Sequence, residues 1–349
     1  MKLSKLAKKD IPWLKSPLSF DGSIISTRIR LARNLNSHPF PVTANSKALK
    51  SCRSEVFNAV SKSSIFKNST KISLDDCSDI DRRLLLERHL ISHEMAVSEN
   101  FGALIIDDRE QMSIMVNEED HLRIQYISGG LNLFDSWEII NNADDELSSI
   151  LDFAYSEKFG YLTACPTNTG TGMRASCQMH LPGLALSGDL ISTMESINKM
   201  GMVVRGLHGE GTKIMGDVLQ VSNQVTLGIS EQRILDNLDR LATQVSQREK
   251  KIRENLMSND PDTIKDRVFR SKGILLNAHK ITFTEALDLI SALRLGVYIG
   301  IIEYDIDKLN NLMIKILPAH IQEVHGKVMD SKQRNKLRAN IIKETLHKD

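Results

Sequence analysis

The sequence predicts a mixed α+β domain followed by a smaller, all-helical domain, with the boundary near residue 228. Between residues 20 and about 228, short segments rich in Val and Ile alternate apolar with polar side chains, and helical patterns lie between them. After Gly228 the pattern is helical almost throughout. The chain has 349 residues, which is enough to bury a core in each of two such domains.

The first domain contains seven predicted strands, at residues 23–31, 102–106, 112–117, 121–127, 161–165, 202–207 and 218–227. Helical patterns occupy residues 46–61, 79–97, 135–153 and 189–199. Only three residues separate the third and fourth strands, which favours an antiparallel hairpin. In the second domain Ser230 is a good N-cap, and helices are predicted at residues 230–256, 262–276, 284–300, 306–316 and 331–346.

The composition is that of an ordinary globular protein, with 41% hydrophobic and 26% charged residues. A formal net charge of +1 provides no global field for nucleic acid or an acidic membrane. No apolar run approaches the length of a membrane span, and the charged N-terminus lacks the apolar segment of a secretory signal. The four cysteines form no CxxC pair and have no histidine at zinc spacing, so we expect no protein-held metal and a reducing compartment, the cytoplasm.

The segment ISTRIRLARN places Arg28 and Arg30 on one face of a predicted strand, with Ile29 and Leu31 on the other. Two adjacent guanidinium groups repel each other unless an anion lies between them. Such a pair is a good phosphate clamp, because each arginine offers paired donors to oxyanions. From these residues alone, a solvated strand face is an equally good interpretation.

Two glycine-containing loops each accompany another arginine. In CPTNTGTGMRAS, Gly170 and Gly172 allow the backbone to come close to a ligand, and Arg174 follows. The loop is not a Walker A motif, because it lacks GKS or GKT. In VVRGLHGEGT, Arg205 ends an apolar strand, and Glu210 lies in a glycine-rich loop that suits a lid delivering a carboxylate. For both segments an ordinary turn or loop is the alternative.

The stretch VNEEDHLRI puts three acids, Glu118, Glu119 and Asp120, in the turn of the predicted hairpin. If the second strand keeps its parity back into the turn, Glu119 shares a face with His121 and Arg123. Glu119 would then look toward the same space as Arg123. It is therefore favoured over the other two acids as a functional carboxylate.

The segments STRIR, NEEDHLR, CPTNTGTGMRAS and RGLHGEGT occur in the order and with the internal spacings of the guanidino (phosphagen) kinase family, which the chain resembles over residues 20–228. Within that family it is most similar to the bacterial protein arginine kinases, on the basis of QVSNQVTLG, MHLPGL and GILLNAHKITFTEALDLISALRLG in the helical tail. The resemblance implies an antiparallel sheet flanked by helices, with nucleotide bound on the sheet. It also implies transfer of the γ-phosphoryl group of ATP, with Mg²⁺, to the guanidinium of an arginine side chain.

The resemblance assigns roles to individual residues. Glu119 corresponds to the general base, Glu210 to the loop-borne acid that holds the guanidinium, and Cys165 to the active-site cysteine. Contacts with the ATP phosphates fall to Arg28, Arg30, Arg123, Arg174 and Arg205. Further contacts with the nucleotide fall to Ser26, Thr27, Asn168, Gly170, Thr171, Gly172, Met173, Ala175 and Ser176. Mg²⁺ is expected to be held mostly by phosphate oxygens and water.

The roles of three further residues are less direct. His121 is expected to be a structural hydrogen-bonding residue beside Glu119 rather than a base. In the tail, Arg334 and Asn335 stand where the bacterial branch has a phosphoarginine-sensing Arg–Asp pair. Asn in place of Asp removes one charge-assisted bond, so a regulatory pocket and a solvated basic helix remain equal interpretations.

The STRIR segment begins at Ser26, which leaves no room for the helical N-terminal domain of metabolic family members. A site without that cover could admit an arginine that protrudes from a protein. We therefore expect protein substrates, with a heat-shock repressor as one candidate. Residues 1–228 would form the catalytic domain, and residues 229–349 a dimerisation and regulatory domain.

The resemblance further implies a homodimer, an McsA-like activator, and a Clp chaperone and protease that receive the marked proteins. It implies no direct contact with a membrane or with nucleic acid. Two alternatives remain open at this point. One is a metabolic kinase for free arginine, and the other is a catalytically weak adaptor that binds phosphoarginine proteins.

Overall fold

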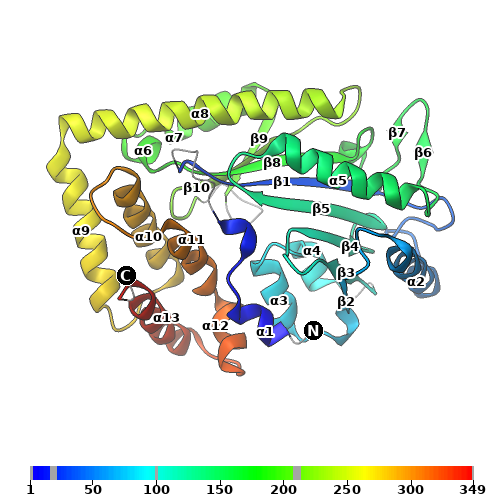
Figure 1. Ribbon diagram of the computed structural model, residues 1–349, viewed down its shortest axis with the longest axis horizontal. Coiled ribbons are helices and arrows are strands. Elements are labelled where there is room, and N and C mark those ends of the chain that lie inside the picture. Colours follow the sequence, from blue (N-terminus) through cyan, green and yellow to red (C-terminus); the bar gives the residue numbers. More distant parts are fainter. Residues whose placement is uncertain (1–2, 16–21, 99–100, 207–213, 348–349) are drawn as a thin grey trace.

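The computed structural model describes residues 3–15, 22–98, 101–206 and 214–347 (Figure 1). Eight strands in these ranges form one sheet in the spatial order β2-β3-β4-β5-β1-β8-β10-β9, and each neighbouring pair is antiparallel. The strands are β1 (Ile24–Arg33), β2 (Thr70–Ser73), β3 (Ala103–Ile106), β4 (Met112–Val116), β5 (Leu122–Gly129), β8 (Met173–His180), β9 (Met202–Gly206) and β10 (Val218–Asn223). A separate hairpin pairs β6 (Tyr155–Ser156) with β7 (Gly160–Tyr161).

The two faces of the central sheet differ because side chains alternate along each strand. On β1, Ile29 and Leu31 are fully buried, whereas Arg28 and Arg30 point to the opposite face. The apolar face packs against α2 (Ser46–Lys62), α5 (Leu133–Ser148), α7 (Leu190–Lys199) and the first half of α8 (Glu231–Asn259). The predicted antiparallel sheet flanked by helices is therefore confirmed.

The arginine-bearing face is framed at its margins. On the β3–β4 side it is covered by α3 (Asp79–Glu87) and α4 (His93–Val97), whose apolar residues form a small core with Leu104, Ile106 and Met115 of the sheet. On another side, Ile25, Ile127 and Val218 of the sheet pack against the N-terminal turn η1 (Pro12–Leu14) and the helical tail. The open space between these margins is where a ligand can reach the arginines.

Three predicted elements are wrong. The helix expected at 79–97 is divided, because His89 has φ +60° and Ser92 starts α4 by accepting the N–H of Met95. The helix expected at 135–153 ends at Ser148. The strand expected at 161–165 is reduced to Tyr161 of β7, while β8, which lies inside the sheet, was not predicted.

The tail consists of α8 followed by five shorter helices: α9 (Pro261–Asn277), α10 (Phe283–Tyr298), α11 (Ile306–Lys315), α12 (Pro318–His325) and α13 (Ser331–Leu346). Figure 1 shows α9 turning away from the end of α8, with α10–α13 gathered beside it. The first half of α8 shares the core of the sheet, whereas α9–α13 share a second core with η1. The domain boundary near residue 228 stays a prediction. Among the described helices, none is both long and apolar enough to cross a membrane.

Candidate active site

Five arginines from four strands point to the same face of the sheet. Arg28 and Arg30 come from β1, Arg123 from β5, Arg174 from β8 and Arg205 from β9. Directly paired residues on neighbouring strands share a face. Arg30 pairs with Arg174, and Arg123 pairs with the residue two positions beyond Arg30. The register of β8, β10 and β9 brings Arg205 to that face as well.

This face is crowded with positive charge. Burial, together with the charges of Arg174 and Arg123, lowers the pKa of Arg28 to about 10. Burial and the charges of Arg205 and Arg123 lower the pKa of Arg174 to about 10. Burial and the charges of Arg28, Arg123 and Arg174 hold the pKa of Arg30 well below its usual value. The Nε of Arg30 is buried without a hydrogen-bond partner among the described residues. An anion placed among these groups would relieve the repulsion.

Arg123 is held by two acids of the β4–β5 turn. Its Nη1 donates to Glu118 Oε1 at 2.6 Å, and its Nη2 donates to Glu119 Oε2 at 3.1 Å. The expectation that Glu119 alone would face Arg123 is wrong, because Asn117 adopts φ +55° and the turn does not continue the strand's parity. The Glu118 side chain is 2% exposed and the Glu119 side chain 38%, so Glu118 anchors Arg123 and Glu119 is open to a ligand.

Burial raises the pKa of Glu119, and the charge of Arg123 opposes this rise. The neighbouring acids Asp120 and Glu118 raise the pKa further, and a hydrogen bond with the Cys165 thiol lowers it. The thiol sulfur lies 3.0 Å from Thr167 Oγ1. Glu119 and Cys165 are thus neighbours in space although 46 positions separate them in the printed sequence.

The next two residues of the turn are structural. Asp120 is fully buried. Its Oδ1 accepts a hydrogen bond from Asn34 Nδ2 at 2.6 Å and another from the backbone N–H of Ala164 at 2.7 Å. His121 Nδ1 accepts the N–H of Leu35 at 3.0 Å, so its Nε2 carries the hydrogen and donates to Pro39 O at 3.0 Å. Burial lowers the pKa of His121 to about 4. His121 is a structural hydrogen-bonding residue, and its partners lie in the segment that follows β1.

A cavity of about 590 Å³ lies over the arginine-bearing face. It brings together the predicted residues Arg30, Arg123, Arg174, Arg205, Glu119, Cys165, Asn168 and Gly172. Lining residues that were not predicted are Ala32, Glu118 and Thr167, with Ser92, Glu94, Met95 and Ser98 from α4 and its flanks. The cavity can hold a polyphosphate against its arginines and a cationic acceptor against its acids.

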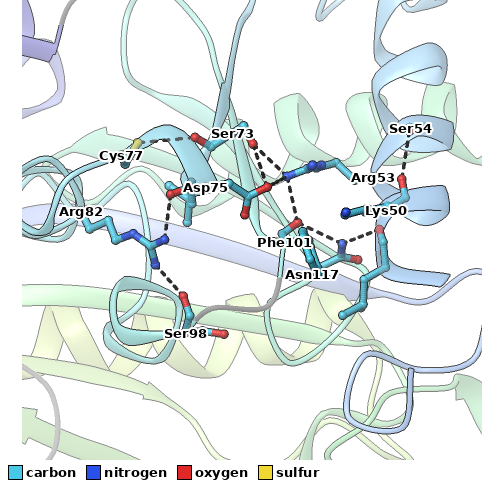
Figure 2. A network of polar contacts seen from close by, with 12 residues as sticks. Lys50, Arg53, Ser54, Ser73, Asp75, Cys77, Arg82, Ser98, Phe101 and Asn117 are labelled. Carbon is cyan, nitrogen blue, oxygen red and sulfur yellow. Dashed lines mark hydrogen bonds and ion pairs between the residues drawn. The ribbon is translucent and has the colours of Figure 1, made fainter. Parts of the chain in front are cut away.

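Side chains outside the cavity fix its α4 wall (Figure 2). Arg82 Nη1 donates to Ser98 O at 2.5 Å, and its Nη2 donates to Leu74 O at 2.8 Å. Arg53 of α2 reaches Phe101 O at 3.4 Å. These contacts hold the backbone on both sides of residues 99–100, and a change to Arg82 would act on the wall without altering the arginine-bearing face.

Several predicted nucleotide contacts face the protein itself. A Cβ added to Gly170 would lie 2.3 Å from Thr226 O, and one added to Gly172 would lie 2.6 Å from Ala32 O. Both glycines therefore let the loop approach its own chain, and Gly172 also lines the large cavity, so their contact with a ligand stays a prediction. Four other residues that were predicted to contact the nucleotide have buried side chains that contact other parts of the protein: Thr27, Thr171, Met173 and Ala175.

A second, small cavity of about 20 Å³ lies beside Arg28. The predicted residues Ser26, Arg28 and Ser176 line it, together with Trp13, His89, Ile127, Gln178 and Gln220. Arg28 Nη2 donates to Gln220 Oε1 at 2.9 Å, and Ser26 Oγ donates to Gln178 Oε1 at 3.2 Å. Trp13 and His89 carry no local sequence signal, because only the fold brings them here.

The remaining predicted residues lie elsewhere. Glu210 falls outside the described residues. Arg334 and Asn335 lie on α13, where Arg334 Nη2 donates to Ser331 Oγ at 3.1 Å and Asn335 Oδ1 accepts from Arg338 Nη1 at 2.5 Å. Both side chains are thus engaged within the tail. The phosphoarginine pocket remains a prediction.

Comparisons with known proteins identify the family of the chain. A sequence model described as ATP:guanido phosphotransferase, C-terminal catalytic domain, matches residues 51–252, and one described as Protein-arginine kinase McsB C-terminal domain matches residues 261–349. Relatives include the protein-arginine kinase of Caldanaerobacter subterraneus subsp. tengcongensis, 41% identical over 334 residues that cover 95% of this chain and 99% of the relative. The protein-arginine kinase of Pelotomaculum thermopropionicum is 45% identical over 328 residues, covering 92% and 91%.

Solved structures share the fold at lower identity. Lombricine kinase matches with a TM-score of 0.60 and 20% identity, over 71% of each chain. The duplicated taurocyamine kinase from Schistosoma mansoni matches with a TM-score of 0.62 and 23% identity, over 80% of this chain and 41% of that one.

These matches define an enzyme that transfers phosphoryl groups to guanidines, and a sheet face lined with arginines next to a carboxylate and a thiol suits that chemistry. The chain belongs to the ATP:guanido phosphotransferase family, in the branch that carries the McsB C-terminal domain.

Proposed function

We propose that this chain transfers the γ-phosphoryl group of ATP to the guanidinium group of arginine side chains in proteins. The observation that carries the proposal is the single cavity in which four arginines face Glu119 and Cys165. A triphosphate is anionic, and arginine suits its oxygens because the planar guanidinium presents paired donors. A carboxylate in the same cavity suits a cationic acceptor.

In the proposed reaction one terminal nitrogen of the acceptor attacks the γ-phosphorus as the bond to the β–γ bridging oxygen breaks and ADP leaves. The attacking nitrogen must lose a proton, because a guanidinium with a pKa above about 12 is a poor nucleophile. Glu119 takes that proton, and the rise in its pKa makes it a stronger base. The arginines neutralise the charge on the moving phosphoryl group. Glu210 would hold the other side of the guanidinium.

Mg²⁺ would supply further charge neutralisation across the phosphates. Within the described ranges, no cluster of three or more His, Cys, Asp or Glu side chains is arranged to hold a metal. A metal ion would therefore be ligated chiefly by phosphate oxygens and water, which fits the way Mg²⁺ is usually held beside nucleotides.

The choice of a protein as acceptor is supported by the relatives named protein-arginine kinase, which match this chain over almost its whole length, and by the McsB C-terminal match. We include in the proposal a homodimer formed through the helical tail, a cytoplasmic location and an McsA-like activator, as the resemblance of the sequence implies. The modified proteins would include a heat-shock repressor and substrates of a Clp-type protease.

The test is incubation with ATP, Mg²⁺ and an arginine-rich protein such as casein, followed by mass spectrometry under non-acidic conditions. Phosphate on arginine is the expected result. Label on Ser, Thr or Tyr alone would contradict the proposal. Rapid turnover of free arginine at millimolar concentration, without transfer to protein, would assign the chain to metabolic guanidine phosphorylation instead.

A further inference from the structure

The N-terminal strap, residues 10–15, connects the helical tail to the sheet. The N–H of Ile11 donates to Asn311 Oδ1 at 2.7 Å, and Asn310 Nδ2 donates to Leu14 O at 3.2 Å, so the strap is fastened to α11. Its apolar side chains belong to the core of the tail. The Figure 1 view shows the strap running between the tail helices and the sheet.

On its other side the strap lies directly on β5. A Cβ added to Gly129 would lie 2.2 Å from Lys15 O and 3.0 Å from Trp13 O. Contacts this close require glycine at the end of β5. The position of Trp13 is therefore set by the sheet below it and by α11 beside it.

Trp13 has an unusual hydrogen-bonding state. The residue is 2% exposed, and its indole Nε1 is buried with no partner in the part of the chain that the structure describes. A buried donor left unpaired is destabilising, and such donors are rare in native proteins. Trp13 is one of the residues that line the small cavity beside Arg28, so a ligand that enters this space lies next to its side chain.

The lining of this cavity suits the nucleoside part of a nucleotide. The imidazole of His89 meets the Trp13 ring edge to face, with 5.6 Å between ring centroids. Gln178 and Gln220 supply amides, and Arg28 stands at the boundary with the other arginines. When phosphates lie on the arginines, the sugar and base must extend away from them, and the cavity beside Arg28 is one place where they can lie. A space of about 20 Å³ admits one polar group of water size, so an edge of the ligand enters it.

We propose that Trp13 is a nucleotide-binding residue whose indole N–H donates to an acceptor atom on the nucleoside part of bound ATP or ADP. The contact makes the strap, and through it α11, part of the nucleotide site. This inference rests on the proposed function, because it takes the phosphates to lie on the arginine-bearing face.

A fluorescence titration tests the contact directly. The chain has two tryptophans, Trp13 and Trp137 of α5, so Trp137→Phe leaves Trp13 as the only indole. ADP should change the emission of this variant with saturation, whereas inorganic triphosphate should bind the arginines without changing it. Unchanged emission while calorimetry shows ADP bound would overturn the proposal. An equal response to triphosphate would also overturn it, because the nucleoside would then be irrelevant.

A second variant separates a contact from a packing role. Trp13→Phe keeps an aromatic ring and removes the N–H, so the dissociation constant for ADP should rise about 2–10-fold while that for triphosphate stays the same. The matched control, Trp137→Phe, should change neither. A lower melting temperature with unchanged ADP affinity would make Trp13 structural and refute the inference. Binding of ADP needs no acceptor protein, so this outcome is distinguishable from failure of the proposed function, which would appear as absent phosphoarginine with the unmodified chain.

Discussion

Replacing Glu118 and Glu119 by glutamine, one at a time, should show which acid removes the proton from the acceptor and which one positions Arg123. Glu118→Gln and Glu119→Gln both keep the size of the side chain and remove one negative charge. The structure gives the two acids different surroundings. Glu118 is 2% exposed and lies 2.6 Å from Arg123, whereas Glu119 is 38% exposed and lies 3.1 Å from it.

The expected magnitudes follow from those surroundings. Glu119→Gln removes the general base, which is worth typically about 10²–10⁴-fold in kcat, and should leave KM for ATP within about threefold. Glu118→Gln removes a buried charge-assisted hydrogen bond of about 1.5–3 kcal/mol. Because Arg123 is proposed to act on the phosphoryl group, this loss corresponds to about 10–150-fold in kcat/KM for ATP.

The assay is steady-state transfer of labelled phosphate from ATP to casein, with ATP binding measured separately by calorimetry. Thermal unfolding of both variants checks that they fold. Normal turnover by Glu119→Gln would refute its role as the base. If Glu118→Gln leaves kcat and KM for ATP unchanged while Glu119→Gln raises only KM for ATP, then Glu119, and not Glu118, is the acid that positions Arg123.

Three further predictions concern the cationic face, the buried histidine and the α4 wall. Arg30→Met should raise the melting temperature of the nucleotide-free protein by a few degrees, because it removes a crowded charge, and should abolish stabilisation by ATP; a lower melting temperature would show that repulsion is not the governing effect. His121 keeps a pKa of about 4 in the fold, so the unfolded chain alone takes up its proton below about pH 6.5; stability to urea should fall by up to roughly 3 kcal/mol between pH 6.5 and 4, and an equal slope in His121→Asn would contradict this. Arg82→Gln should raise KM for the protein acceptor several-fold and leave KM for ATP unchanged; a change in KM for ATP instead would place the α4 wall at the nucleotide.

Much of the sheet could be predicted because strands such as β1 and β5 alternate apolar with polar side chains, and β4 is a short apolar run next to a turn. β8 was missed since its inward side chains, including Met173, Ala175 and Cys177, are not β-branched, and the loop before it dominates the pattern. The division of 79–97 into α3 and α4 depends on the left-handed backbone of His89, which the helical periodicity of the segment does not reveal.

The site shows the same limit. Arg28, Arg30, Arg123, Arg174 and Arg205 could be found because each lies in a distinctive local segment. The role of Glu118 depends on the dihedral angles of a turn, and that of Trp13 on the packing of a strap against β5 and α11. The alternation of side chains along a strand predicts which face of the sheet each side chain occupies. It predicts neither the direction of a side chain in a turn nor a contact between segments far apart in the sequence.

The absence of a carboxylate partner among the described residues, rather than arginine itself, distinguishes Arg28 and Arg174 on the functional face, whereas Arg123 is paired with Glu118 and Glu119. Arg33 and Arg88 are at least as buried as the site arginines, yet each is bound by a carboxylate: Arg33 Nη2 lies 2.7 Å from Asp144 Oδ2, and Arg88 Nε lies 2.7 Å from Glu110 Oε2. In the described part of the chain, Arg28 and Arg174 donate instead to the neutral side chains of Gln220 and Ser222. A buried charge without a counterion is costly, so a fold that needed these arginines only for stability would have supplied acids for them as well. Because Arg28 and Arg174 lack acidic partners among the described residues, their N–H donors remain available to an anion. Repulsion among the arginines destabilises the empty site, and a bound phosphate relieves that repulsion, which increases the affinity for phosphate.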